Sequence, residues 1–238
     1  MIKNLIDLHT HTTFCNHAYS TFKENLSAAK EKGLEVYGWS EHGYGMPNTT
    51  SKIFFKNLRV INREIDGIKV LIGMEANILD KTGKLIEDDE ILKEVDYVIA
   101  SLHTCCYKKG DTEDNTQAMI NAIKNPYVKI LGHPDDGRYP VDHEKVVLAA
   151  KKENVIIEVN NSSFRETSFR KDTRKNMLEM LKYCKKHKVE VLINSDAHIF
   201  HDVGNYKDGF DLIKTIDFPE ELILNDKVDR LKDLLAIK

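Results

Sequence analysis

The feature that most constrains the fold is a repeated unit, in which a short apolar run is followed by an amphipathic helical pattern. The apolar runs predict strands at 5–9, 36–42, 69–76, 96–103, 128–133, 155–161 and 189–198. The helical patterns predict helices at 21–33, 52–64, 88–95, 116–124, 143–154, 171–187, 205–216 and 226–236. Residues 77–87 predict a small hairpin that turns at Thr82–Gly83. This alternation indicates a parallel sheet covered by helices.

Seven such units suit a closed or nearly closed barrel better than an open sheet. An open, doubly wound sheet is the alternative, and a glycine-rich phosphate-binding loop after the first strand would favour it. No such loop follows residues 5–9, and the 238 residues contain no linker or repeat that would divide them. We therefore predict one domain, 1–238, with the α/β architecture of a distorted TIM-like (β/α)7 barrel.

Composition excludes several classes of protein. The net charge is −3 with no basic stripe, which argues against nucleic acid as a partner. No apolar run reaches the roughly 18–20 residues that cross a bilayer, and the start MIKNLIDLHTH lacks the pattern of a signal peptide. We therefore expect a cytoplasmic protein without a membrane partner. Four cysteines do not form a disulfide scaffold, so we interpret them as reduced thiols. The oligomeric state stays open, a homo-oligomer included.

Most histidines fall where predicted strands end. Seven of the ten histidines and two acidic residues occupy such ends or the loops just beyond them: His9, His11, His17, His42, Glu75, His103, His133, Asp196 and His198. A single histidine in this position is more often a surface residue than a ligand. Nine possible ligands at strand ends are harder to dismiss as surface residues, because the C-terminal ends of parallel barrel strands converge on one face. We predict a metal site there.

The spacing of these residues supports that interpretation. Side chains two apart in a strand point to the same side, so His9 and His11 can bind one ion, as can Asp196 and His198. Nine donors fit two ions, or three if a carboxylate bridges, and Glu75 is the natural bridge because a carboxylate has two oxygens. Imidazole and carboxylate together suit zinc, manganese or iron. Cys15 and Cys105 are rival ligands, although we favour simple buried or rim thiols.

The motifs that carry these residues resemble those of the PHP (polymerase and histidinol phosphatase) family. They are DLHTH at 7–11, HAYS at 17–20, SEHG at 40–43, GMEANI at 73–78, SLH at 101–103, GHP at 132–134, EVNNSS at 158–163 and NSDAH at 194–198. The likeness extends nearly end to end and is greatest to the stand-alone bacterial phosphatases with a trinuclear zinc site. One departure is Ser40-Glu41-His42, where the family usually has Thr-Asp-His; it puts the role of that carboxylate in doubt.

The resemblance implies a distorted seven-stranded barrel and three divalent ions, most simply zinc. It assigns His9, His11, Glu75 and Asp196 to the first ion, Glu75, His103 and His133 to the second, and His17, His42 and His198 to the third. It also implies hydrolysis of small phosphate monoesters by a metal-activated hydroxide, with Glu75 and Asp196 as the catalytic carboxylates.

Substrate contacts are harder to predict. Arg138 and Arg165 lie in loops after predicted strands and could grip a phosphate with two hydrogen bonds each. Asn160 either faces the pocket or satisfies loop backbone. Three alternative functions stay open: a histidinol-phosphate phosphatase, an amidohydrolase-type hydrolase and a metal-binding protein without catalysis. Amidohydrolases often bridge their metals with a lysine on a middle strand, and no lysine ends a middle strand here.

Overall fold

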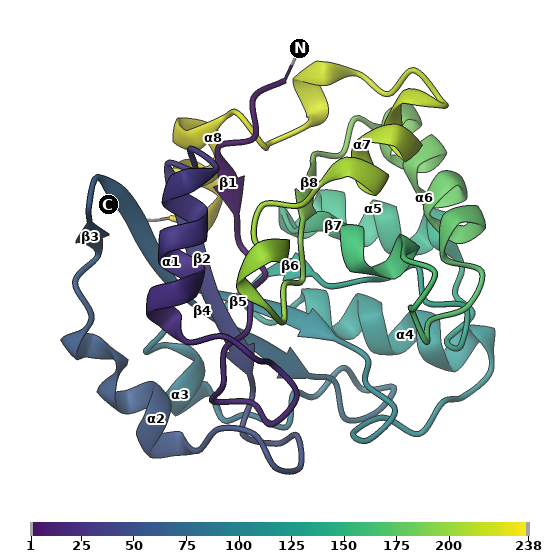
Figure 1. The fold of residues 1–238 in the computed structure, drawn as a ribbon. Helices are drawn as coiled ribbons and strands as arrows, with labels where there is room; N and C mark the ends of the chain where they lie inside the picture. The colour runs from purple at the N-terminus through teal and green to yellow at the C-terminus, as the bar shows by residue number, and fades with distance from the viewer. Residues whose placement is uncertain (1, 237–238) are drawn as a thin grey trace.

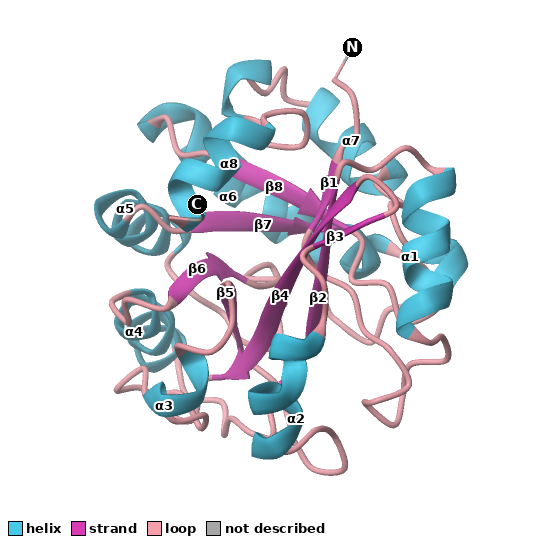
Figure 2. Ribbon diagram, turned by 90° about the vertical axis from the view of Figure 1, so that its left-hand side faces the viewer, coloured by secondary structure: helices cyan, strands magenta, loops and turns pink. Residues whose placement is uncertain are grey.

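A computed structural model describes residues 2–236 and contains a parallel seven-stranded sheet curled into a nearly closed barrel (Figures 1 and 2). The strands run in the order β1-β2-β4-β5-β6-β7-β8. Their bounds are β1 (Ile6–Asp7), β2 (Val36–His42), β4 (Ile68–Asn77), β5 (Tyr97–Ser101), β6 (Val128–Leu131), β7 (Ile156–Asn160) and β8 (Val191–Asn194). The predicted barrel and its strand count are confirmed.

Helices cover the outside of the sheet (Figure 2). They are α1 (Phe22–Glu31), α2 (Lys52–Asn57), α3 (Asp89–Leu92), α4 (Thr112–Ile123), α5 (His143–Glu153), α6 (Thr173–His187), α7 (Lys207–Lys214) and α8 (Val228–Leu235). Most of the buried apolar side chains lie between these helices and the strands. No helix within residues 2–236 combines the length and the apolar character needed to cross a bilayer.

The barrel interior has its own apolar core below the predicted site. Ile6, Leu71 and Ile130 face inward, and Leu231 and Leu235 of α8 pack against the same cluster. The largest interior side chain is that of Tyr97, whose hydroxyl donates to the backbone oxygen of Leu8 at 2.6 Å. Glycines on two neighbouring strands make room for its ring: a Cβ at Gly38 would lie 2.2 Å from the Tyr97 hydroxyl, and one at Gly73 would lie 2.3 Å from its Cζ.

The two ends of the sheet meet in a short seam. The residues after β1 and β8 form a parallel bridge between Thr10 and Ala197. The backbone N–H of His11 donates to the Ala197 oxygen at 2.8 Å, and the Ala197 N–H donates to the His9 oxygen at 3.3 Å. Elsewhere in the seam, side chains replace backbone pairing: Asn194 Oδ1 accepts from the Leu8 N–H at 2.9 Å. The seam therefore brings the first and last predicted ligand pairs side by side.

The predicted helix at 52–64 is wrong in its second half. Helix α2 ends at Asn57, a 3-10 turn follows over Leu58–Val60, and β3 (Glu64–Ile65) pairs antiparallel with β4. The turn between β3 and β4 consists of Asp66 and Gly67, with φ of 54° and 82°. Asp-Gly with two positive φ values is a favoured hairpin turn, and it overrides the helical pattern.

The other boundaries differ by a few residues. Helix α4 begins four residues before the predicted 116, because the Asp111 side chain accepts from the backbone of Asp114 at 2.9 Å and caps the helix. The predicted hairpin at 77–87 is present, with a bridge between Ile78 and Leu85 and a φ of 74° at Gly83. Strands β1 and β8 are shorter than predicted, because the chain leaves the ladder where the ligand candidates begin.

Candidate metal centre

The barrel brings the predicted donors to the C-terminal ends of its strands. His42 ends β2 and lies directly opposite Glu75 of β4 in the strand register. His103 and His133 lie two residues beyond β5 and β6. Two further pairs, His9 with His11 after β1 and Asp196 with His198 after β8, lie beside these residues because the seam joins the two edges of the sheet. Residues that are up to 189 positions apart thus meet around Glu75, which is buried.

One oxygen of Glu75 and three other possible ligand atoms form a first group: Glu75 Oε2, His9 Nε2, His11 Nε2 and Asp196 Oδ1. Glu75 Oε2 lies 3.4 Å from His9 Nε2 and 3.5 Å from His11 Nε2. Asp196 Oδ1 lies 3.6 Å and 3.3 Å from the same two nitrogens. Ligands on a tetrahedral ion with bonds of about 2.0–2.1 Å are separated by roughly 3.3–3.4 Å. These four donors therefore have the spacing of a zinc site.

Unpaired polar atoms provide an independent test of the fit. His9 Nε2, His11 Nε2 and Glu75 Oε2 are buried and have no hydrogen-bond partner among the residues that the structure describes. Buried polar atoms without partners are costly and rare in proteins. Three of them aimed at one another fit a cation, which would satisfy all three together. The residues present therefore fit a metal ion.

A second group forms on the other oxygen of Glu75. Its Oε1 lies 2.8 Å from His133 Nε2 and 3.1 Å from His103 Nε2. The His103 ring is oriented by Asn77, whose Oδ1 lies 2.8 Å from His103 Nδ1. Each oxygen of Glu75 thus faces a different set of imidazoles, which is the arrangement expected of a bridging carboxylate.

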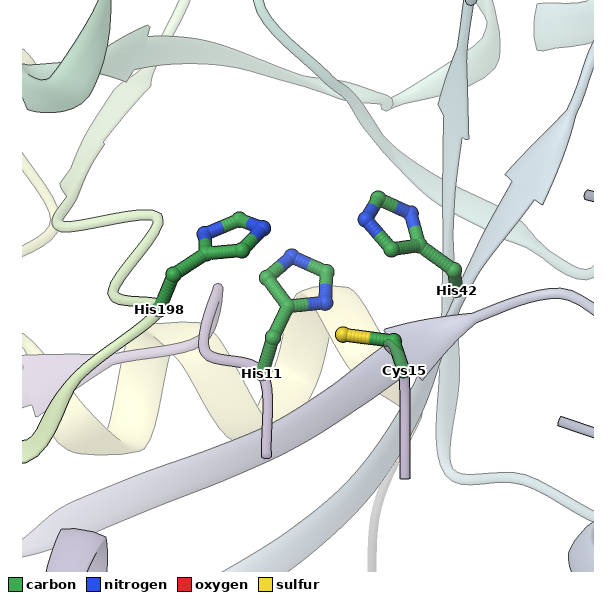
Figure 3. Close-up of side chains that lie close together, drawn as sticks. All are labelled: His11, Cys15, His42 and His198. Atoms are coloured by element: carbon green, nitrogen blue, oxygen red, sulfur yellow. The ribbon is translucent and has the colours of Figure 1, made fainter. Parts of the chain in front are cut away.

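The third predicted group, His17, His42 and His198, lies toward the mouth of the barrel. The Nε2 atoms of His17 and His42 are 3.0 Å apart, and the ring centroids of His17 and His198 are 5.0 Å apart. Figure 3 shows the rings of His11, His42 and His198 gathered above the Cys15 sulfur. Donor atoms of these four residues all lie within 4.8 Å of one another.

Cys15 is a neighbour of this group. Its thiol donates to the backbone oxygen of Thr12 at 3.3 Å, and burial raises the pKa of the thiol above its usual range. A protonated thiol is a poor ligand. Cys15 is therefore a buried thiol whose sulfur lies beside three imidazoles, and our preference for a simple thiol over a ligand stays a prediction.

Protonation states also suit metal binding. Burial lowers the pKa of His103 and of His198 to about 4, so both imidazoles are neutral at pH 7 and keep a lone pair. Burial alone would raise the pKa of the Glu75 carboxyl, but the imidazoles of His103 and His9 outweigh it and hold that pKa well below its usual value. His103 and His198 therefore present neutral rings near an ionised Glu75, whereas the carboxylates of Glu158, Asp196 and Glu75 outweigh burial and raise the pKa of His9 well above its usual value.

Glu158, which the sequence analysis did not single out, holds the centre from below. It is fully buried in β7, and its Oε1 accepts from His9 Nδ1 at 2.7 Å and from Asn194 Nδ2 at 2.9 Å. Its Oε2 accepts from the His133 backbone N–H at 2.8 Å and from Asn160 Nδ2 at 3.0 Å. Because an ionised carboxylate only accepts, His9 must carry a proton on Nδ1, so Nε2 is the nitrogen that would bind a cation.

The unusual Glu41 occupies the corresponding place below His11. Its Oε1 accepts from the backbone of Thr12 and from Trp39 Nε1, both at 2.7 Å. Its Oε2 is 4.0 Å from His11 Nδ1, which is too long for a hydrogen bond. The Glu41 carboxylate therefore lies beside His11 without orienting its ring as Glu158 orients that of His9.

Two ligand candidates have unusual backbone. His133 has a φ of 28° and Asp196 a φ of 52°, in the left-handed region that non-glycine residues rarely adopt. Such conformations persist where surrounding contacts enforce them and cluster at functional sites. At both positions the chain has left its strand and turns its side chain back over the barrel.

A cavity of about 530 Å³ opens above the centre. Both predicted arginines line it, and each is paired with a carboxylate: Arg138 Nε lies 2.9 Å from Asp136 Oδ2, and Arg165 Nη1 lies 2.6 Å from Asp202 Oδ2. A third arginine, Arg170, was not predicted.

Arg170 touches the centre itself. Its Nη2 donates to Asp196 Oδ2 at 3.0 Å, and its Nη1 lies 3.2 Å from both Asn160 Oδ1 and Ser163 Oγ. Asn160 is fully buried, and its amide nitrogen also donates to Asp196 Oδ2, at 3.1 Å. Asn160 thus lies below the cavity and holds Asp196, rather than lining the cavity as a substrate contact would.

Comparisons with known proteins give a consistent result. The model of the PHP domain matches residues 7–162. A "Probable phosphatase" of Thermoanaerobacter sp. (strain X514) is 44% identical over 238 residues, which cover 100% of this chain and 96% of that protein. A "Probable phosphatase" of Clostridium botulinum (strain Okra / Type B1) is 40% identical over 237 residues, with the same coverage.

Solved structures share the fold. The crystal structure of histidinol phosphate phosphatase from Lactococcus lactis, complexed with zinc, L-histidinol and phosphate, has a TM-score of 0.62 at 18% identity. It covers 91% of this chain and 95% of that one. A chain in archaeal ribonuclease P with mature tRNA has a TM-score of 0.59 at 18% identity, covering 96% of this chain and 90% of that one. Likeness at this identity extends to the fold alone.

Proposed function

This chain belongs to the PHP-domain family, and from that premise we propose that it is a metal-dependent phosphatase that hydrolyses small phosphate monoesters. The observation that carries the proposal is the convergence of five histidine side chains on the two oxygens of Glu75: His9, His11 and His42 on Oε2, and His103 and His133 on Oε1. The names of the curated relatives support the same reaction class.

We propose that the centre holds three divalent ions, with zinc as the leading candidate. His9, His11, Glu75 and Asp196 would hold the first, Glu75, His103 and His133 the second, and His17, His42 and His198 the third. Bound divalent ions lower the pKa of water, supply hydroxide at neutral pH and neutralise phosphate charge. The donor spacing and the unpaired nitrogens described above support this assignment.

The chain's own residues would bind and orient the substrate. Arg170 lies in the cavity wall against Asp196, where its planar guanidinium can donate to a phosphate oxygen as well. Arg138 and Arg165 stand farther out and are each held by an aspartate, so we propose that they attract the dianion toward the mouth. Asn160 and Glu158 fix Asp196 and His9 in place.

The test is a metal analysis coupled to a substrate screen. The purified protein is measured by elemental analysis, then assayed on a panel of phosphate monoesters that includes histidinol phosphate, and on amides and lactones. We expect about three divalent ions per chain, phosphatase activity that chelation abolishes, and recovery with zinc or manganese. Amide or lactone hydrolysis without phosphatase activity would assign the amidohydrolase alternative instead. Full metal loading without any turnover would identify a metal-binding protein.

A further inference from the structure

One aromatic side chain, that of Phe169, lines the cavity beside the candidate metal centre. Phe169, in the loop between β7 and α6, lines the cavity yet has 72% of its surface exposed. Met46 and Pro47, from the loop after β2, line the same cavity. Phe169 thus offers an uncovered aromatic surface at the mouth of a site that is otherwise largely polar, where a ligand in the cavity can reach it.

The Phe169 ring is held in place by cations. The Arg138 guanidinium lies 4.7 Å from the ring centroid, and that of Arg170 lies 5.7 Å from it. Arg138 is itself fixed by three contacts of 2.5–3.0 Å to the Asp136 carboxylate. The ring is therefore positioned beforehand, while 72% of the surface of Phe169 stays exposed for contact with another flat group.

The cavity is larger than the reacting group requires. Its volume of about 530 Å³ falls within the roughly 300–1,000 Å³ of pockets that enclose whole small molecules. A phosphate at the centre leaves room for an organic group that extends toward the mouth. That group would meet Phe169 and three arginines, Arg138, Arg165 and Arg170, which disfavours a cationic group there.

We propose that Phe169 forms a stacking subsite for a flat, uncharged aromatic or heteroaromatic group, so that the enzyme favours aryl and arylalkyl phosphate monoesters over aliphatic or cationic ones. The inference rests on the phosphatase activity proposed above and adds the substrate class.

The experiment compares kcat/KM of the zinc-loaded enzyme for phenyl phosphate, glycerol 1-phosphate and histidinol phosphate. Phe169→Ala and Phe169→Leu remove the aromatic ring, Phe169→Tyr retains it, and Phe200→Ala is the matched control. Phe200 is 45% exposed in the loop after β8 and does not line the cavity.

We expect Phe169→Ala and Phe169→Leu to lower kcat/KM for phenyl phosphate about tenfold and for glycerol 1-phosphate less than twofold. The tyrosine variant and the Phe200 control should keep the wild-type preference. Equal losses on both esters, or wild-type selection of glycerol 1-phosphate or histidinol phosphate, would overturn the subsite.

Binding separates this inference from the proposed reaction. Phenylphosphonate and methylphosphonate are not hydrolysed, and calorimetry measures their Kd for the same variants without turnover. Phenylphosphonate should bind about tenfold more tightly than methylphosphonate to the wild type, and the difference should vanish in Phe169→Ala. If no ester is hydrolysed but this difference holds, the phosphatase proposal fails and the aromatic subsite stands. If esters are hydrolysed but the two phosphonates bind equally, the subsite fails alone.

Discussion

The substitution Glu158→Gln tests whether the buried carboxylate below the centre organises it. Glutamine keeps the size of the side chain but replaces one acceptor oxygen with an amide that donates. The carboxylate accepts from four groups, two on each oxygen: the side chains of His9 and Asn194 on one, and the backbone N–H of His133 and the side-chain amide of Asn160 on the other. In either orientation of the glutamine amide, its NH2 group replaces one of the two oxygens. The two hydrogen bonds to that oxygen are lost, and their two donors then face the NH2 group, which is itself a donor.

The magnitude follows from those contacts. A hydrogen bond to a buried charged group contributes about 1.5–3 kcal/mol, so losing two should lower the free energy of unfolding by at least about 3 kcal/mol. For a chain of 238 residues this is a fall in Tm of about 6–12 °C. The substitution also replaces the charged acceptor that fixes the His9 tautomer with a neutral amide oxygen or an amide donor, which should weaken zinc binding by about 10–100-fold.

Thermal unfolding of the metal-free and zinc-loaded proteins, together with a zinc titration, measures both effects. Glu190→Gln is the matched control, because Glu190 is only partly buried and pairs with the exposed Arg230. A surface pair contributes about 0–1 kcal/mol, so the control should unfold close to the wild type. If Glu158→Gln matched that control in Tm and in zinc affinity, the argument that Glu158 orients His9 would be refuted.

Three further outcomes are expected. Glu75→Gln, which leaves one oxygen to serve two groups of imidazoles, should reduce the metal content by at least one ion per chain and the phosphatase activity by about 100-fold or more; full loading would contradict the bridge. Cys105, which is exposed, should react rapidly with a thiol-specific disulfide reagent, while the buried Cys184, whose pKa burial raises to about 12, should react only on unfolding; equal rates would contradict this order. Gly67→Ala should lower the free energy of unfolding by about 1 kcal/mol because Gly67 has a φ of 82°, and an unchanged denaturation midpoint would argue against the tight turn.

Much of the architecture could be predicted because parallel barrel strands are buried on both faces. Such strands appear in the sequence as continuous apolar runs, and β2 has the predicted bounds, Val36–His42. The donors could be predicted because their position along the strands, at the C-terminal ends, is itself a property of the sequence. Once the strands were assigned, topology alone brought His9, Glu75 and Asp196 together.

Other features depend on contacts that no local pattern carries. Glu158 interrupts an apolar strand, a signal for a buried carboxylate, but its four partners come from three other segments or from its own strand end. Arg170 lies in a loop, and nothing local indicates that it folds back onto Asp196, 26 positions later. The β3–β4 turn was different, because Asp66-Gly67 between two isoleucines is a hairpin signal in the sequence that the longer helical pattern obscured.

The seam between β1 and β8 links closure of the barrel to the geometry of the site. The ladder there is minimal, and side chains replace it: Asp7 Oδ1 accepts from the Ser195 N–H at 3.1 Å, and Asn194 joins Leu8 to Glu158. With the ladder interrupted, Asp196 can take its left-handed backbone and turn toward the histidines across the seam. A cation held by His11 and Asp196 would link the two edges of the sheet, so metal affinity and barrel closure would depend on the same contacts.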